Sequence, residues 1–255
     1  MTTLASVAAV LRCFSEVRTE LTVTDVAALL PAPKSTVSRL LRAMRDTGFI
    51  ESVGETKRYR PGVMLFEAGH VYRRASSLVA RADDVVKTVS AQVGHSGYVS
   101  VRDGLDVVGL TYHPGSHVLR VATPIGRRLS AFASATGRTL LARLSDDEVQ
   151  RLYPTLPPPP SPNAPQTVEE LLARLAQVRR EGFAESNDEA NRGVAAIAVA
   201  VGDPDTREAV SLCMTFPSAI ITAGERDAII QGLLIGAKHI AAILGDGSNH
   251  NTRTK

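Results

Sequence analysis

The chain of 255 residues has little cysteine and no long apolar run. Cys13 and Cys213 lie far apart in apolar-patterned segments, so we expect reduced packing residues rather than a disulfide. No apolar run approaches the length that crosses a bilayer, and the N-terminus lacks the charged start and apolar stretch of a secretion signal. These absences predict a cytoplasmic protein with no membrane partner.

Enzyme and metal signatures are missing too. None of the six histidines forms a helical pair around a Glu, and the pair His113 and His117 encloses Pro-Gly-Ser, which breaks a helical zinc site. There is no Gly-x-Ser-x-Gly elbow, and the segment 126–138 lacks the Gly-Lys-Ser/Thr end of a phosphate loop. We therefore predict no catalytic residues, no cofactor and no metal.

The most informative segment runs from Pro33 to Thr47. Its apolar residues recur at the spacing of one helix face: Val37, Leu40, Leu41 and Met44. The opposite face carries only hydroxyl and guanidinium groups: Ser35, Ser38, Arg39 and Arg42. Exposed helices usually mix Glu with Lys, whereas this segment has no carboxylate before Asp46. The face is therefore suited to phosphates and base edges.

The residues before this segment predict a helix-turn-helix. A first helix over 4–17 would close a small core, and Thr22 with Asp25 forms an N-cap pattern for a second helix. The turn 31–33 contains two prolines and leads into the helix described above. Two short helices joined by so tight a turn are typical of DNA-binding proteins.

The residues after it predict a wing. Thr47-Gly48 is a helix C-cap pattern, and the runs 49–53 and 58–60 predict a β-hairpin. We expect Lys57 and Arg58 to reach a neighbouring phosphate from this hairpin.

Segments in both halves of the chain resemble the IclR-type bacterial transcriptional regulators. In the first 62 residues the resemblance rests on the segments 10–16, 21–27 and 33–41. In the second half it rests on 129–142, 180–189 and 193–198. The resemblance covers about residues 4 to 244, with two unrelated motif sets in the expected order. It implies an α+β protein in which a winged helix-turn-helix is joined by a linker helix to a GAF-like antiparallel-sheet effector domain.

On this basis we divide the chain into a DNA-binding domain (1–62), a linker helix (63–81), an effector-binding and oligomerisation domain (82–244) and a disordered tail (245–255). Lys and Arg number nine against six Asp and Glu in the first part, three against one in the second, and seventeen against nineteen in the rest. The basic excess therefore lies at the predicted DNA-binding end.

An apolar stripe runs along the predicted helical segment 63–94. Its members are Met64, Ala68, Val71, Ala75, Leu78, Val79 and Ala82. Either a partner subunit or the rest of the same chain would cover this stripe. The resemblance implies a homodimer, or a dimer of dimers, with the linker in the interface.

The larger domain shows alternating strand patterns. We predict strands at 98–102, 107–112, 118–121, 183–187, 195–201 and 208–216. We predict helices at 134–144, 146–153, 167–181 and 222–244. The segment 154–165 holds seven prolines in twelve residues and predicts an extended loop.

The resemblance also implies an effector pocket in this domain. The positions that match the family's effector contacts are Leu129, Ala135, Thr136, Ser186, Ala196, Cys213 and Thr215. Hydroxyl and backbone N–H groups would hold an anionic end, while Leu129 and Ala196 would line the apolar end. Ser186 replaces a frequent acidic residue, and Cys213 a frequent Ser. The implied effector is an aromatic or other small organic acid.

We therefore predict a transcriptional regulator that binds double-stranded operator DNA and responds to such an effector. The predicted DNA contacts are Lys34, Ser35, Thr36, Ser38, Arg39, Arg42, Lys57 and Arg58. Two other classes stay open. A winged helix that binds a protein would need no basic face, and a small-molecule enzyme would show turnover.

Overall fold

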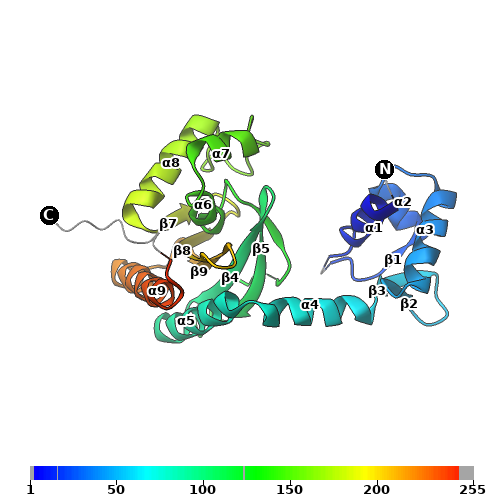
Figure 1. The fold of residues 1–255 in the computed structure, drawn as a ribbon, viewed down its shortest axis with the longest axis horizontal. Helices are drawn as coiled ribbons and strands as arrows, with labels where there is room; N and C mark the ends of the chain where they lie inside the picture. The colour runs from blue at the N-terminus through cyan, green and yellow to red at the C-terminus, as the bar shows by residue number, and fades with distance from the viewer. Residues whose placement is uncertain (1–2, 16, 123, 247–255) are drawn as a thin grey trace. The chain divides into compact units, whose positions relative to one another are not determined.

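The computed structural model describes residues 3–15, 17–122 and 124–246, and the chain forms two compact units, Met1–Ala75 and Ser76–Lys255 (Figure 1). The elements of the N-terminal unit are α1 (Thr3–Leu11), β1 (Leu21–Thr22), α2 (Val23–Leu29), α3 (Lys34–Asp46), β2 (Ile50–Ser52), β3 (Arg58–Pro61) and α4 (Val63–Ala75). Its core is formed by side chains from all three predicted helices and from the hairpin: Val10, Leu21, Val26, Val37, Leu41, Met44 and Ile50. The predicted helix-turn-helix and wing are both present.

The ends of α2 and α3 follow from their capping residues. Thr22 and Asp25 form a capping box, in which the Thr22 hydroxyl accepts from the Asp25 backbone N–H at 3.2 Å and the carboxylate accepts from the Thr22 N–H at 2.8 Å. After α3, Gly48 adopts a φ of +80°, which favours glycine, and Phe49 donates to the carbonyl of Met44 at 2.9 Å. The chain then enters the wing.

Two details of this unit differ from prediction. The first helix ends at Leu11 rather than Val17, because the next turns are tight and the Arg18 guanidinium donates to the carbonyl of Cys13. A third strand, β1, pairs with β3 through Leu21 and Tyr59. A two-residue strand has no periodicity to detect, so only the fold reveals it.

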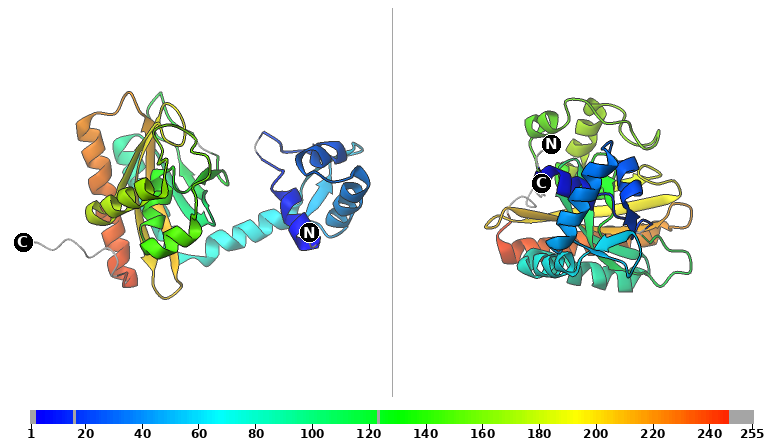
Figure 2. Two further views of the ribbon diagram at one scale, coloured as in Figure 1. Left: turned by 90° about the horizontal axis from the view of Figure 1, so that it is seen from above. Right: turned by 90° about the vertical axis from the view of Figure 1, so that its right-hand side faces the viewer.

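The C-terminal unit is one six-stranded antiparallel sheet with helices on both faces (Figures 1 and 2). Its helices are α5 (Ser77–Val93), α6 (Ala135–Leu141), α7 (Asp146–Leu152), α8 (Val168–Glu181) and α9 (Ala223–Leu244). Its strands are β4 (Ser96–Asp103), β5 (Asp106–His113), β6 (Arg128–Ser130), β7 (Ala184–Asn187), β8 (Val194–Asp203) and β9 (Glu208–Pro217), in the order β6-β5-β4-β9-β8-β7.

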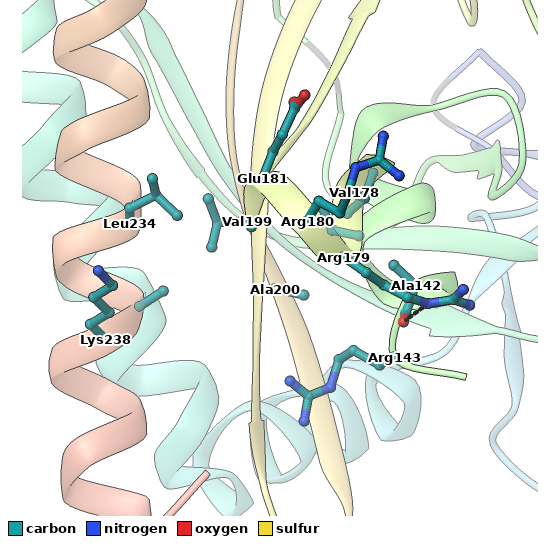
Figure 3. Close-up of a pocket in the computed structure, with 13 residues that line it drawn as sticks. Ala142, Arg143, Val178, Arg179, Arg180, Glu181, Val199, Ala200, Leu234 and Lys238 are labelled. Atoms are coloured by element: carbon teal, nitrogen blue, oxygen red, sulfur yellow. Dashed lines mark hydrogen bonds between the residues drawn. The ribbon is translucent and has the colours of Figure 1, made fainter. Parts of the chain in front are cut away.

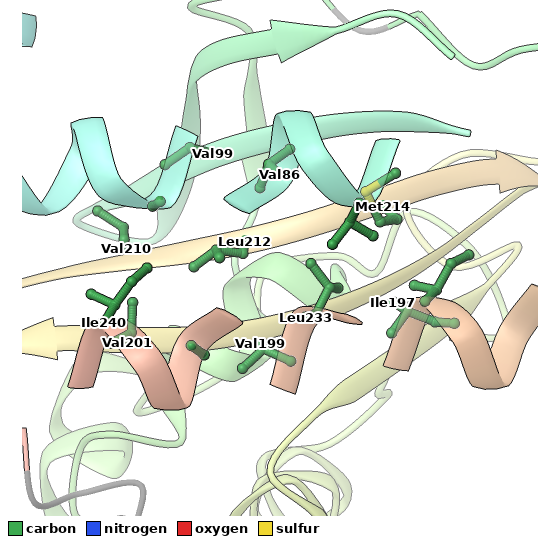
Figure 4. Packing of buried hydrophobic residues seen from close by; sticks show 14 of the residues in the cluster. Val86, Val99, Ile197, Val199, Val201, Val210, Leu212, Met214, Leu233 and Ile240 are labelled. Atoms are coloured by element: carbon green, nitrogen blue, oxygen red, sulfur yellow. The ribbon is translucent and has the colours of Figure 1, made fainter. Parts of the chain in front are cut away.

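The main core lies between this sheet and the pair α5 and α9 (Figure 4). Val86 of α5 and Leu233 and Ile240 of α9 pack against Leu212 and Met214 of the central strand β9. The opposite face is covered by α6, which in turn packs against α8. This second face carries the predicted effector positions.

The strand predicted at 118–121 is absent. Val118 is 96% exposed, and the segment forms no ladder with a neighbouring strand. The edge strand is instead β6, which Arg128 holds in place through ion pairs to Asp103 at 2.8 Å and Asp106 at 2.9 Å. Short-range alternation alone could not tell these two segments apart. The proline-rich segment 154–165 is a loop, as predicted.

The apolar stripe is divided at Ser76, where α4 ends and the hydroxyl of Ser76 caps α5. Its second half, Leu78, Val79 and Ala82, is buried in the core of the C-terminal unit. Its first half lies on α4 and is exposed, as are Phe66 and Tyr72 of the same helix. The division between the units therefore falls inside the predicted linker range. The predicted tail lies outside the described residues from position 247 onward.

Helix α9 corrects the expectation that no apolar run reaches a membrane-spanning length. Its 22 residues include a window with a mean hydropathy of 1.5, and a third of that window is buried. By length and composition it is the one helix of the described chain that passes this test. The core helix of a soluble protein passes it as well, and Ile229, Leu233 and Ile240 of α9 are buried against the sheet.

Candidate functional site

The predicted DNA-binding face is present on α3. Val37, Leu41 and Met44 are buried, whereas Arg39 and Arg42 are exposed on the other side of the helix. Lys34, Ser35 and Thr36 are also exposed, and Ser38 is half-buried. The sequence pattern therefore has the orientation that we expected.

Three cations of this face have no partner among the residues that the structure describes. Within the part of the chain that the structure describes, Lys34, Arg39 and Arg42 form no ion pair and no side-chain hydrogen bond. Arg45 differs, because it binds Asp46 at 2.7 Å at the end of the same helix. An unpaired guanidinium keeps all its donors available for an external anion.

The two predicted wing residues have different surroundings. Lys57 lies in the exposed hairpin turn and has no ion pair among the described residues. Arg58 begins β3 opposite Thr22, beside the N-terminus of α2. There the pKa of Asp25 is lowered, mainly by hydrogen bonds from Thr22 and in smaller part by the charge of Arg58. The Arg58 side chain is exposed and has no ion pair among the described residues.

Four of the seven predicted effector positions form two rows across the sheet. Ser186, Ala196 and Thr215 are direct cross-strand partners on β7, β8 and β9. In the next row, Cys213 lies between Ala198 of β8 and Tyr98 of β4. Cross-strand partners share one face of a sheet, and this face contacts Ala135 at the start of α6. We call these positions the effector rows.

The hydroxyl and thiol groups of the effector rows are buried. The Oγ1 atom of Thr215 is buried and has no hydrogen-bond partner among the described residues. Burial raises the pKa of Cys213 to about 11, with an opposing hydrogen bond from Thr136, so its thiol is neutral at pH 7. A buried hydroxyl without a partner is rare, which makes Thr215 available to a bound ligand.

Leu129 does not join the effector rows. It lies on β6 at the sheet edge, pairs with Val107 and packs in a separate cluster around Phe132 and Tyr153. Sequence similarity placed Leu129 among the effector contacts. In the sheet, however, Leu129 lies beside Val107, five residues along β5 from Tyr112, whereas Cys213 lies in the row of Tyr98 and Tyr112. Periodicity could not have detected this separation.

Sequence reasoning missed an aromatic pair beside the effector rows. Tyr98 and Tyr112 face each other across β4 and β5, with ring centroids 5.0 Å apart. The Tyr98 hydroxyl donates to the carbonyl of Val121 at 3.2 Å. The turn at Asp103-Gly104 alone would pair Tyr98 with Thr111. A β-bulge between Val99 and Ser100 shifts the register so that Tyr98 faces Tyr112, and the predicted hairpin did not include this bulge.

A buried ion-pair network connects α6 with α8 and with the segment after β7. The Arg138 guanidinium, 1% exposed, donates to the carboxylate of Glu189 and to the carbonyl of Glu185 at 2.7 Å. Arg174 of α8 donates to the same Glu189 carboxylate at 3.0 Å. The network ties α6 to the segment that follows β7, next to Ser186.

A cavity of about 420 Å³ lies between α6, α8, β8 and α9 (Figure 3). Four cationic side chains line it: Arg143, Arg179, Arg180 and Lys238. Two of them are engaged, because Arg143 binds Asp246 at 3.0 Å and Arg179 binds Asp146 at 2.7 Å. None of the predicted effector residues lines this cavity.

Known proteins share both units. Residues 3–54 match the model of the IclR helix-turn-helix domain, and residues 70–242 match that of the bacterial transcriptional regulator IclR C-terminal domain. The HTH-type transcriptional regulator XynR of Escherichia coli (strain K12) is 30% identical over 211 residues, which cover 81% of this chain and 82% of XynR.

Solved structures show the same fold. An IclR transcriptional regulator from Alicyclobacillus acidocaldarius has a TM-score of 0.83 at 24% identity, covering 95% of this chain and 98% of that one. An IclR homolog from Microbacterium hydrocarbonoxydans, complexed with 4-hydroxybenzoate, has a TM-score of 0.76 at 21% identity, with 94% and 100% covered.

The C-terminal family model alone covers more than half of the chain. The matched relatives are transcriptional regulators, which confirms the prediction of a regulator over an enzyme. The chain belongs to the IclR family of bacterial transcriptional regulators, with an N-terminal helix-turn-helix DNA-binding domain and a C-terminal effector domain.

Proposed function

We propose that this chain binds operator DNA through the exposed face of α3 and the wing, as a homodimer. The observation that carries this proposal is the set of three cations on α3, Lys34, Arg39 and Arg42, that lack partners among the described residues. The proposed contacts are Lys34, Ser35, Thr36, Ser38, Arg39, Arg42, Lys57 and Arg58.

The roles of these groups follow from their chemistry. Arg39 and Arg42 donate two parallel hydrogen bonds to guanine or to a phosphate, and the hydroxyls of α3 bind the DNA backbone or base edges. Two copies of α3 enter successive major grooves, which requires half-sites about 34–36 Å apart. The exposed apolar residues of α4, including Phe66 and Val71, support a second copy of the chain as the partner.

We further propose that a small organic acid with an aromatic or other apolar body binds at the effector rows. Thr215 donates to its carboxylate, and Ser186 and Thr136 are the neighbouring hydroxyls. Ala135, Ala196 and Cys213 line the apolar side, while the stacked tyrosines supply an aromatic wall. The relative bound to 4-hydroxybenzoate, a ring with a carboxylate and a hydroxyl, supports this ligand class. Leu129 lies outside this set.

Coupling to DNA binding would run through β9. This strand carries Thr215, and its first residue, Glu208, accepts a 2.5 Å hydrogen bond from Ser76, the residue between α4 and α5. A ligand that prefers one position of β9 therefore favours one conformation at Ser76, the connection between α5 and α4. The ligand regulates only through this difference in affinity between states.

The experiment that tests the proposal is footprinting on the DNA upstream of the chain's own gene, with and without a panel of aromatic and aliphatic acids. We expect a protected, roughly palindromic site whose protection changes with one class of acid. A duplex affinity that does not change with salt would favour a protein-binding winged helix instead. Turnover of any panel member would favour an enzyme.

A further inference from the structure

Three side chains with metal-binding atoms converge on the α5 and α9 side of the sheet. They are His95, just before β4, His117, after β5, and Glu225, in the first turn of α9. Their ligand atoms all lie within 4.8 Å of one another. The Nε2 atoms of His95 and His117 are 3.8 Å and 3.6 Å from Oε1 of Glu225. His95 also packs beside the ring of Phe216, in the main core and on the face opposite the effector rows.

Two glycines make this convergence possible. Gly94 ends α5 with a φ of +73°, and a Cβ atom there would lie 2.9 Å from the His117 ring. A Cβ atom on Gly115 would lie 2.1 Å from the carbonyl oxygen of Gly94. Because residues 94 and 115 are both glycines, the backbone N–H of His117 can approach the Gly94 carbonyl and donates to it at 3.1 Å. The His117 ring then stacks on His95 at 4.5 Å.

The carboxylate of Glu225 is aimed by a capping box. Its Oε2 atom accepts from the backbone N–H of Thr222 at 2.9 Å and from the Thr222 hydroxyl at 2.7 Å. These two bonds fix the orientation of the Glu225 carboxylate. The other oxygen, Oε1, is left facing the two imidazoles.

The His95 imidazole has an unmet bonding requirement. Its side chain is 2% exposed, and its buried Nε2 atom has no hydrogen-bond partner among the described residues. Buried polar atoms without a partner are rare and call for an explanation such as an ion.

We propose that His95, His117 and Glu225 bind a divalent transition-metal ion, with Zn²⁺ as the best match and water completing the coordination. Zn²⁺ bonds of about 2.0–2.1 Å in tetrahedral geometry separate ligand atoms by roughly 3.3 Å, close to the two observed separations. Two imidazoles exclude Ca²⁺ and Mg²⁺, which take oxygen ligands. His117 is 39% exposed and turns out of its stack, giving up its 3.2 Å contact with the Val93 carbonyl.

The ion would fasten three distant parts of the C-terminal unit. It joins the end of α5, the segment after β5 and the start of α9. That segment continues to Val121, whose carbonyl accepts from Tyr98 beside the effector rows. A metal here would therefore stabilise the unit and restrain one wall near the effector rows, on the other face of the sheet.

The test is a Zn²⁺ titration of the chelator-treated, full-length chain by calorimetry, together with thermal unfolding. We expect one Zn²⁺ per chain and a Tm that rises with Zn²⁺ concentration. Glu225→Gln keeps a residue that can form the capping box but removes the carboxylate, and we expect at least tenfold weaker binding. We expect the same of His117→Gln.

Two matched controls define the site. Glu148→Gln alters the equivalent capping box of α7, where Ser145 is the N-cap, and His239→Gln removes an exposed histidine of α9. Both should bind Zn²⁺ as the wild type does. Co²⁺ in the wild type should give a visible spectrum that the Glu225 and His117 variants lose.

Two results would overturn the proposal. One is Zn²⁺ affinity in folded Glu225→Gln and His117→Gln chains equal to that of the wild type. The other is a wild-type chain that takes up none of Zn²⁺, Ni²⁺ and Fe²⁺. Circular dichroism of each variant confirms that the fold is intact, so loss of binding cannot be mistaken for unfolding.

Discussion

Replacing Arg39 or Arg42 by alanine should separate DNA binding from stability. Both side chains are exposed and have no ion pair among the described residues, so each truncation should change the free energy of unfolding by no more than about 0.5 kcal/mol. A bidentate contact to guanine contributes about 1–3 kcal/mol of discrimination, which corresponds to a roughly 5- to 160-fold loss of affinity per contact. A dimer loses two such contacts.

The assay is fluorescence anisotropy with the footprinted operator at several salt concentrations, beside thermal unfolding of the same samples. An arginine that binds guanine loses specificity at one base pair and leaves the salt dependence nearly unchanged. An arginine that binds a phosphate lowers the slope of log K against log salt by about 0.9 for each contact. The slope thus tells the two roles apart.

Arg45→Ala is the matched control, because this guanidinium lies on the same helix but is already paired with Asp46. We expect Arg45→Ala to bind DNA nearly as the wild type does. If Arg39→Ala and Arg42→Ala both bind the operator with wild-type affinity, the DNA-binding assignment of α3 is refuted.

Three further predictions concern the two units separately. Thr215→Val should weaken binding of the organic acid about tenfold yet leave Tm unchanged or raised, because it removes a buried hydroxyl without a partner. A lower Tm with unchanged ligand affinity would refute this role. Glu189→Ala should destabilise the C-terminal unit by about 3–5 kcal/mol in urea unfolding, since it leaves buried Arg138 uncompensated. Glu185→Ala, which breaks an exposed pair, should cost less than about 1 kcal/mol, and equal losses would contradict the reasoning. The pKa of Asp25 is lowered in the folded state, so its contribution is present above the unfolded pKa near 4 and is lost as pH falls further. The Tm of Asp25→Asn should fall less steeply than that of the wild type as pH is lowered below about 4. Identical pH dependence of the two Tm values would refute this linkage.

Local patterns predicted the N-terminal unit well. The period of Val37, Leu41 and Met44 oriented α3, the Thr22 and Asp25 pair set the start of α2, and Gly48 set the end of α3, because these signals act within a few residues. The Asp103-Gly104 turn likewise sets the register of β4 and β5 as far as Ser100 and Gly109, beyond which a β-bulge shifts it. The prediction was poorer at β1, which is too short to show a period, and at 118–121, where a strand-like alternation forms no ladder.

The candidate sites depend on longer distances. Ser186, Ala196 and Thr215 meet because three strands pair in one register, and Leu129 is excluded by that same register. The Arg138 and Glu189 pair joins residues with no shared sequence pattern. No sequence pattern predicted that His95 and His117 meet Glu225. The two histidines nearest each other in sequence are His113 and His117, and only His117 belongs to the cluster.

By itself, the sequence determined which helix faces are apolar, which carry cations without carboxylates, where helices and turns begin, and to which family the segments are similar. Those properties reside in neighbouring residues and in side-chain chemistry. The tertiary structure alone decided which hydroxyls share a face of the sheet, which arginines are already paired, where the apolar stripe is covered and which imidazoles meet a carboxylate. Packing and strand register bring distant residues together, and neither is written in local periodicity.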